Sequence, residues 1–131
     1  MELIAPNLES SFYNYMIRLH GHHEDLCCKL LDAMATRSPN ARRFWSELDE
    51  SLRTHMESEE RYVLPAFARI DREEALALIR DHGRIREQLL EIGVAIDLHE
   101  LAQTQRFIDT IREHAAREDK LMARWATAPT P

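Results

Sequence analysis

Apolar residues recur along this chain at spacings of three and four, the period of helices that bury one face. Four stretches carry this pattern, and short polar segments separate them. The predicted helices run from residue 7 or 10 to about 35, from 39 to about 65, from 72 to about 96 and from 98 to about 125. Residues 127–131 are expected to form a frayed tail.

Signals at the helix ends support these boundaries. Ser38-Pro39 has the form of an N-cap followed by proline at the first helical position. Asp71-x-x-Glu74 and Asp97-x-x-Glu100 have the form of capping boxes, in which a capping side chain precedes a glutamate by three residues. Pro65 should kink or end the second helix within about a turn, because proline lacks the amide proton that a helix needs.

Long helices joined by short loops pack as antiparallel neighbours. We therefore expect an all-α protein, an up-down-up-down antiparallel four-helix bundle built as a repeated helix pair. The 131 residues are enough for one domain with a core and too few for two, so residues 1–131 are predicted to be a single domain. The aromatic residues Phe44, Trp45, Phe107 and Trp125 are expected in the core.

Composition narrows the class of partner. The chain is 44% hydrophobic and 31% charged, as soluble globular proteins are. A formal net charge of −6 argues against a nucleic-acid or membrane partner bound by bulk positive charge. No apolar run approaches the ~20 residues that cross a bilayer. The two cysteines, Cys27 and Cys28, are adjacent and cannot staple a small fold, which favours a reducing cytoplasm.

Six histidines and glutamates repeat at one offset. Each half of the chain has a histidine followed 32 positions later (55 − 23) by His-x-x-x-Glu, and the halves are offset by 59 (82 − 23). The residues are His23, His55 and Glu59 in the first half, and His82, His114 and Glu118 in the second.

All six fall within the apolar stripes of their helices, so they should point into the core. Histidine and glutamate at i and i+4 share one helix face. The two histidines of each antiparallel pair should also lie at similar height, at ~1.5 Å of rise per residue. Burying ionised carboxylates without partners costs several kcal/mol each, and the stripes contain no matching lysine. A site for two metal ions is therefore favoured over a metal-free, hydrogen-bonded polar core.

At these residues the chain resembles the hemerythrin-like domain, or HHE cation-binding family. The segments that carry the resemblance are 23–26, 55–65, 81–85 and 114–122. The resemblance implies a non-heme di-iron centre bridged by an oxo or hydroxo group. In that centre His23 and His55 would hold one iron, His82 and His114 would hold the other, and Glu59 and Glu118 would bridge them. Imidazole and carboxylate ligands also suit manganese or zinc.

One position departs from the family's oxygen carriers. Those proteins have a second histidine four residues after the third-helix histidine, where this chain has Arg86. A set of four histidines and two glutamates is more similar to the family's iron–sulfur-repair and nitric-oxide-response members. Arg86 could pair with a nearby acid such as Glu60 or Asp119. The departure argues against reversible O₂ carriage and leaves an open coordination position for a small molecule.

Two more residues are candidates for the site. His20 lies near the same face as His23 and could replace it or add a ligand, although the repeat counterpart of His20 is Ile79. Cys27, four residues after His23, could face the site or could simply fill core space. His99 is expected at the surface or in a helix cap.

The expected function is to sense, bind or handle O₂, NO or redox signals at a di-iron centre. Two alternatives stay open. One is a di-iron enzyme that reduces peroxide or nitric oxide, and the other is an interaction module that metal merely stabilises. The expected partner is a small diatomic ligand, and the sequence fixes neither enzymatic activity nor oligomeric state.

Overall fold

The computed structural model describes residues 4–127, with side chains from 13 to 124. Every regular element in this part of the chain is a helix, which confirms the all-α prediction. The helices are α1 (Ile4–Ala35), α2 (Ala41–Tyr62), α3 (Leu64–Ile70), α4 (Arg72–Asp97) and α5 (Leu101–Thr127). None of the described helices is long and apolar enough to cross a membrane.

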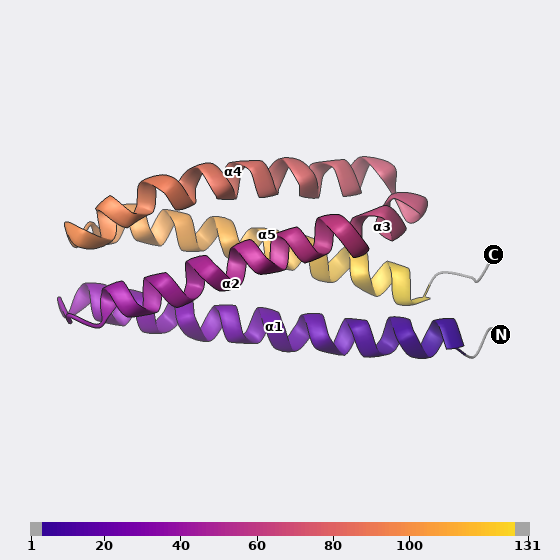
Figure 1. Cartoon of the computed structure of the whole chain (residues 1–131), viewed down its shortest axis with the longest axis horizontal. Coiled ribbons are helices and arrows are strands. Elements are labelled where there is room, and N and C mark those ends of the chain that lie inside the picture. Colours follow the sequence, from indigo (N-terminus) through magenta and orange to yellow (C-terminus); the bar gives the residue numbers. More distant parts are fainter. Residues whose placement is uncertain (1–3, 128–131) are drawn as a thin grey trace.

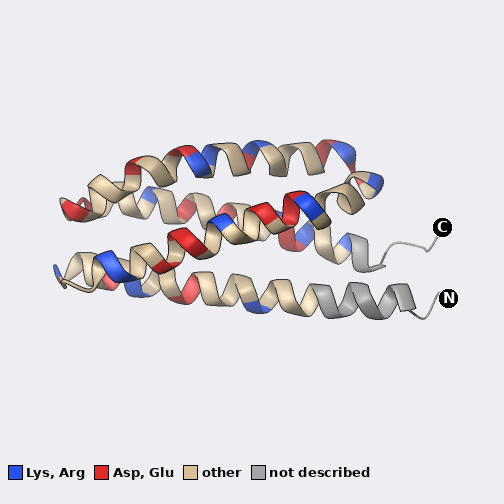
Figure 2. Ribbon diagram, in the orientation of Figure 1, with Lys and Arg blue, Asp and Glu red and all other residues tan. Residues whose placement is uncertain are grey.

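The four long helices lie lengthwise beside one another (Figure 1). The α1–α2 turn and the α4–α5 turn lie at the same end, and the short α3 lies at the opposite end, where it connects α2 to α4. Helix α1 packs against α2 and α5, and α4 packs against the same two helices. Basic and acidic residues are interspersed along the long helices (Figure 2).

The second predicted helix is broken in two by Pro65. Helix α2 ends at Tyr62, and Pro65 lies in the first turn of α3. Proline has no N–H to donate there, so its position in a first turn costs no hydrogen bond. The Val63 N–H still donates to the Glu59 carbonyl at 2.9 Å. The prediction for Pro65 is confirmed, and its consequence is five helices in the described chain where four were expected.

The predicted start of the second helix at Ser38-Pro39 is wrong. Helix α2 begins at Ala41, after Asn40. The Ser38 hydroxyl accepts a hydrogen bond from the Asn40 N–H at 3.2 Å, and the Ser38 carbonyl accepts one from the Ala41 N–H at 3.3 Å. Ser38 therefore closes a turn ahead of the helix and does not cap it.

Only one of the two predicted capping boxes forms a cap. The Asp71 side chain accepts from the Glu74 N–H at 3.0 Å and begins α4 as predicted. Asp97 is instead the last residue of α4, and α5 begins at Leu101. The reason is a C-terminal cap with a residue in the left-handed conformation. His99 adopts a φ of 55°, and the Glu100 N–H donates to the Ala95 carbonyl at 2.8 Å.

Helix α1 begins at Ile4, earlier than residue 7 or 10, and ends at Ala35 as predicted. The Trp45 and Phe107 rings pack in the core with centroids 5.8 Å apart, and Phe44 is partly buried against the same cluster. The Trp125 side chain and the tail after Thr127 lie outside the described residues.

The buried apolar residues form two clusters along the length of the helices. The turn-end cluster includes residues of α1 from 26 to 34, of α2 from 41 to 56, of α4 from 85 to 96 and of α5 from 107 to 111. The α3-end cluster includes Met16, Phe67, Leu78, Leu121 and Met122. On α1, α4 and α5 the repeated histidines and glutamates lie between these clusters, and on α2 Glu59 lies between them while His55 precedes Met56, the last turn-end residue of that helix. Two apolar layers therefore enclose a polar layer.

Candidate metal centre

The six sequence-predicted residues all lie in this polar layer and are all buried. Their exposed fractions range from 0% for His82 and Glu118 to 8% for His114. Helices α1, α2, α4 and α5 each contribute at least one of the six. Residues this polar are seldom buried unless they are paired or bind a metal.

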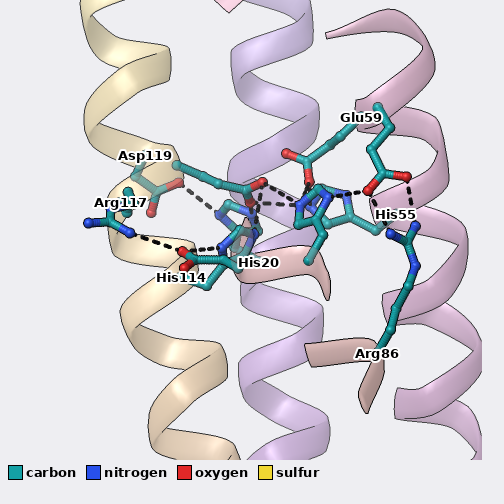
Figure 3. Close-up of polar contacts among 11 residues, drawn as sticks. His20, His55, Glu59, Arg86, His114, Arg117 and Asp119 are labelled. Atoms are coloured by element: carbon teal, nitrogen blue, oxygen red, sulfur yellow. Dashed lines mark hydrogen bonds and ion pairs between the residues drawn. The ribbon is translucent and has the colours of Figure 1, made fainter. Parts of the chain in front are cut away.

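Five of the six converge on one another. Glu59 Oε1 lies 3.1 Å from His82 Nε2 and 3.3 Å from His55 Nε2. Glu118 Oε2 lies 3.2 Å from His114 Nε2, and Glu118 Oε1 lies 3.3 Å from His55 Nε2. Two carboxyl groups from α2 and α5 are thus surrounded by imidazoles from three helices (Figure 3).

The cluster leaves hydrogen-bonding capacity unused. Candidate ligand atoms of Glu59, His82, His114 and Glu118 all lie within 4.8 Å of one another. Among the described side chains, six buried nitrogen or oxygen atoms lack a hydrogen-bond partner, and five of them belong to these four residues. Buried polar atoms are nearly always paired, and leaving them unpaired costs free energy. The donor set therefore fits a cation at its centre.

The electrostatics of the two carboxyl groups lead to the same conclusion. Burial, followed by repulsion from Glu118, raises the pKa of Glu59 well above its ordinary value. Burial alone would also raise the pKa of Glu118, but the Glu59 carboxyl and the surrounding histidines outweigh it and hold that pKa well below its ordinary value. Without a cation, the raised pKa of Glu59 favours its protonated form, because two adjacent buried carboxylates repel each other.

Acids outside the cluster orient two of the imidazoles. The Nδ1–H of His82 donates to Glu60 at 2.8 Å, and the Nδ1–H of His114 donates to Asp81 at 3.1 Å. Each ring then presents Nε2 to the cluster. Such a carboxylate–histidine arrangement fixes the tautomer and the orientation of metal-binding imidazoles.

Arginines hold these outer acids in turn. Arg86 donates two hydrogen bonds of 2.7 Å to the two oxygens of Glu60, which confirms one of its two predicted partners. This forked pair lowers the pKa of Glu60 and raises that of Arg86. Arg117 donates to Asp81 at 3.2 Å. Arg86 occupies the position of the carriers' fifth histidine, and its guanidinium binds an acid outside the cluster (Figure 3).

The two α1 histidines that are candidates for the site, His20 and His23, make different contacts. His20 Nε2 lies 2.9 Å from Glu118, and the His20 Nδ1–H donates to Asp119 at 2.8 Å. His20 forms a second possible metal-binding group with His55 and Glu118. Burial lowers the pKa of His20, but the contacts with Glu118 and then Asp119 reverse this and raise it.

His23, the residue that the sequence repeat selected, is also buried but faces a hydroxyl. Its Nε2 lies 2.7 Å from the Ser51 hydroxyl, and its ring centroid is 5.6 Å from that of His55. Burial, with repulsion from His55, lowers the pKa of His23 to about 3 and keeps the ring uncharged. His23 therefore lies beside the cluster but is not grouped with its carboxylates.

The other sequence candidates lie away from the cluster. Cys27 is fully buried in the turn-end cluster, and burial raises the pKa of its thiol to about 12. It therefore fills core space. His99 is half-buried in the α4–α5 turn.

A cavity of about 450 Å³ between α1 and α2 reaches the cluster. His55 and Glu59 form part of its wall, and so do the hydroxyl residues Ser51, Thr54 and Ser58. The polar layer is thus accessible from one side through a hydroxyl-lined opening.

An all-helical protein with a buried layer of imidazoles and carboxylates belongs to the class of helical metal-binding proteins. The chain matches the Hemerythrin HHE cation binding domain over residues 11–126, nearly its whole length. It therefore belongs to the hemerythrin HHE family, as the resemblance of its four segments predicted. A search of curated proteins and a search of solved structures find no match.

Proposed function

We propose that this protein binds two iron ions in an up-down-up-down four-helix bundle and uses them to sense, bind or handle O₂, NO or redox signals. In this bundle α1–α2 and α4–α5 are the repeated helix pairs, and α3 extends α2. One observation carries the proposal. Five buried atoms without hydrogen-bond partners converge in a member of a cation-binding family.

The residues have distinct roles in the proposed centre. Glu59 and Glu118 lie between the two halves and would bridge the ions, together with an oxo or hydroxo group. His82 and His114 would bind one ion, and His55 with an α1 histidine would bind the other. Bound iron would supply a redox-active cation with a coordination position for a small ligand, and manganese or zinc could replace it.

The cavity between α1 and α2 supports the proposal that the ligand is a small molecule. The α1–α2 cavity leads to His55 and Glu59, and its volume of about 450 Å³ admits a diatomic molecule easily. Its wall of serine and threonine hydroxyls would hydrogen-bond a polar ligand.

Cys27 and Cys28 are both free thiols, which supports a reducing compartment such as the cytoplasm.

Elemental analysis tests the proposal. Protein purified from iron-replete medium, or reconstituted anaerobically with Fe(II), should contain about two ions per chain, one for each metal-binding group. His114→Ala should lose metal and lower the melting temperature, because it leaves Glu118 buried beside an incomplete site. His99→Ala, in the α4–α5 turn, should do neither.

A metal content near zero in the reconstituted protein would refute the proposal. Mixing the reduced protein with O₂, NO or peroxide then separates the functions. Stoichiometric binding of O₂ or NO fits a sensor or binder. Continuous consumption of peroxide or NO would identify an enzyme.

A further inference from the structure

His20 makes the same two kinds of contact as His82. One ring nitrogen faces a carboxyl group of the cluster, and the other donates to an acid outside it. Its Nε2 faces the bridging carboxyl group of Glu118 at 2.9 Å, and its Nδ1–H donates to Asp119 at 2.8 Å. His82 likewise presents Nε2 to Glu59 at 3.1 Å and donates from Nδ1 to Glu60 at 2.8 Å. Figure 3 shows His20 between Asp119 and the centre of the cluster.

Two of the acids that orient these imidazoles, Glu60 and Asp119, are related by the internal repeat. Glu60 follows Glu59 and holds His82, the α4 imidazole. Asp119 follows Glu118 and lies at the repeat offset of 59 from Glu60 (119 − 60). By this symmetry Asp119 should hold the α1 imidazole of the centre, and the residue that it holds is His20.

Height along the bundle selects the same residue. His82 lies 15 positions before the end of α4 (97 − 82), and His20 lies 15 positions before the end of α1 (35 − 20). His55 and His114 lie 14 and 13 positions after the starts of α2 and α5 (55 − 41 and 114 − 101). His23 is only 12 positions from the end of α1 (35 − 23). At a rise of ~1.5 Å per residue, His23 is therefore displaced by about 4.5 Å from the level of His20.

His20, and not His23, lies level with His82 because the two turns differ in length. Residues 36–40 join α1 to α2, whereas only 98–100 join α4 to α5. The first and third long helices therefore superpose at an offset of 62 (97 − 35), measured from Ala35 to Asp97. At that offset the counterpart of His82 is His20, while the sequence repeat of 59 pairs it with His23.

We infer that His20 is the α1 ligand of the metal centre, that Asp119 is its positioning residue, and that His23 is a bystander held by Ser51. The inference rests on the proposed function, since it assigns a residue to the proposed centre. It gives each of the four long helices one imidazole ligand at a common height.

A matched pair of variants tests the inference. His20→Gln and His23→Gln replace largely buried imidazoles three residues apart on one helix with the same amide. Anaerobic Fe(II) titration, repeated with Co(II) and followed by its visible absorption, gives stoichiometry and affinity without any activity assay. We expect His20→Gln to lose one of the two ions and His23→Gln to keep both. Asp119→Asn should keep both ions but weaken binding by about 10- to 100-fold.

Circular dichroism of the metal-free variants establishes that each still folds. Nitrogen-15 spectra of the histidine rings give a readout in metal-free protein, where Asp119→Asn should shift the His20 signals and leave those of His23 in place. Loss of metal in His23→Gln, or equal loss in both glutamine variants, would overturn the assignment while leaving the di-iron proposal intact. Absence of metal from the unmodified protein would sink both.

Discussion

Carboxylates outside the cluster give His82 and His114 of the cluster, and His20 beside it, a fixed orientation. In each case a Nδ1–H donates outward while Nε2 faces Glu59 or Glu118. The pairs are His82 with Glu60, His114 with Asp81 and His20 with Asp119. Because these rings cannot turn freely, the metal ions would meet ligands that are already aligned.

Arg86 supports the His82–Glu60 pair through its contact with Glu60. It donates two hydrogen bonds of 2.7 Å to the two carboxylate oxygens of Glu60. Its place in the sequence of α4 is where an oxygen carrier has a fifth histidine. At this residue the carriers' histidine is replaced by an arginine whose forked ion pair fixes an orienting acid.

Arg86→Gln should weaken Fe(II) binding by about tenfold, because Glu60 loses its anchor and His82 its fixed orientation. Arg86→Lys keeps the charge but not the forked pair, so its affinity for Fe(II) should lie between those of the unmodified protein and Arg86→Gln. Arg80→Gln, at an exposed position of the same helix, serves as the control. Competition with a coloured chelator measures the affinities. Unchanged affinity in Arg86→Gln would show that Glu60 needs no support.

The caps at the helix ends fix where each helix begins, and hence the height along the bundle of the histidines and glutamates that it carries. Asp71 starts α4 by accepting the Glu74 N–H, and Arg124 binds the same carboxylate at 3.0 Å. The hydrogen bond from Glu74, followed by that from Arg124, lowers the pKa of Asp71 below its ordinary value of 3.8. The cap is thus a source of stability that depends on pH.

A lowered pKa in the folded state stabilises the fold above the ordinary pKa, and this contribution is lost as the pH falls through the folded value. Asp71→Ala should therefore lower the melting temperature at pH 7, and the deficit should shrink as the pH falls below 3.8. Asp71→Asn keeps a capping oxygen and should lose only the charge-dependent part. Thermal denaturation of all three proteins across this range provides the measurement. A deficit independent of pH would argue against an ionised cap.

The two halves of the molecule repeat the clustered histidines and glutamates, but the cavities that lead to them differ. The α1–α2 cavity is lined beside His55 by Ser51, Thr54 and Ser58. The repeat-related cavity between α4 and α5 is lined beside His114 by Thr110, Glu113 and Arg117. Arg117 crosses that side through contacts of 2.8 Å with Glu74 and 3.2 Å with Asp81. The hydroxyl-lined side is therefore the more open route to the cluster.

Ser58 is the repeat counterpart of Arg117 (117 − 58 = 59), so Ser58→Arg should transfer the obstruction to the α1–α2 side. We expect severalfold slower uptake of Co(II) by the metal-free protein and slower reaction of the reduced iron protein with NO. Ser46→Arg places the same side chain at an exposed position of α2 outside the cavity wall and controls for added charge. Stopped-flow absorbance gives both rates. Identical rates in the two variants would exclude this route.

The sequence by itself determined the all-helical class, the family and five members of the converging cluster. His55 with Glu59 and His114 with Glu118 are each four residues apart, so the geometry of one helix places them on one face. Pro65 and Asp71 act within a turn of their own positions, and their effects were predictable for the same reason. These contacts are set by neighbours along the chain, although the equally local signals at Ser38-Pro39 and Asp97 gave wrong helix starts.

Only the tertiary structure decided what depends on the relative heights of helices. His20 and His23 are three residues apart and share much of one face, so periodicity cannot choose between them. The lengths of the two turns set how far α1 is displaced along its partner, and this displacement favours the inference that His20 is the ligand. Asp119 and Glu60 meet their imidazoles across helix boundaries, and no local pattern marks such partners. The types of the clustered residues were written in the sequence, while their heights relative to one another were set by packing.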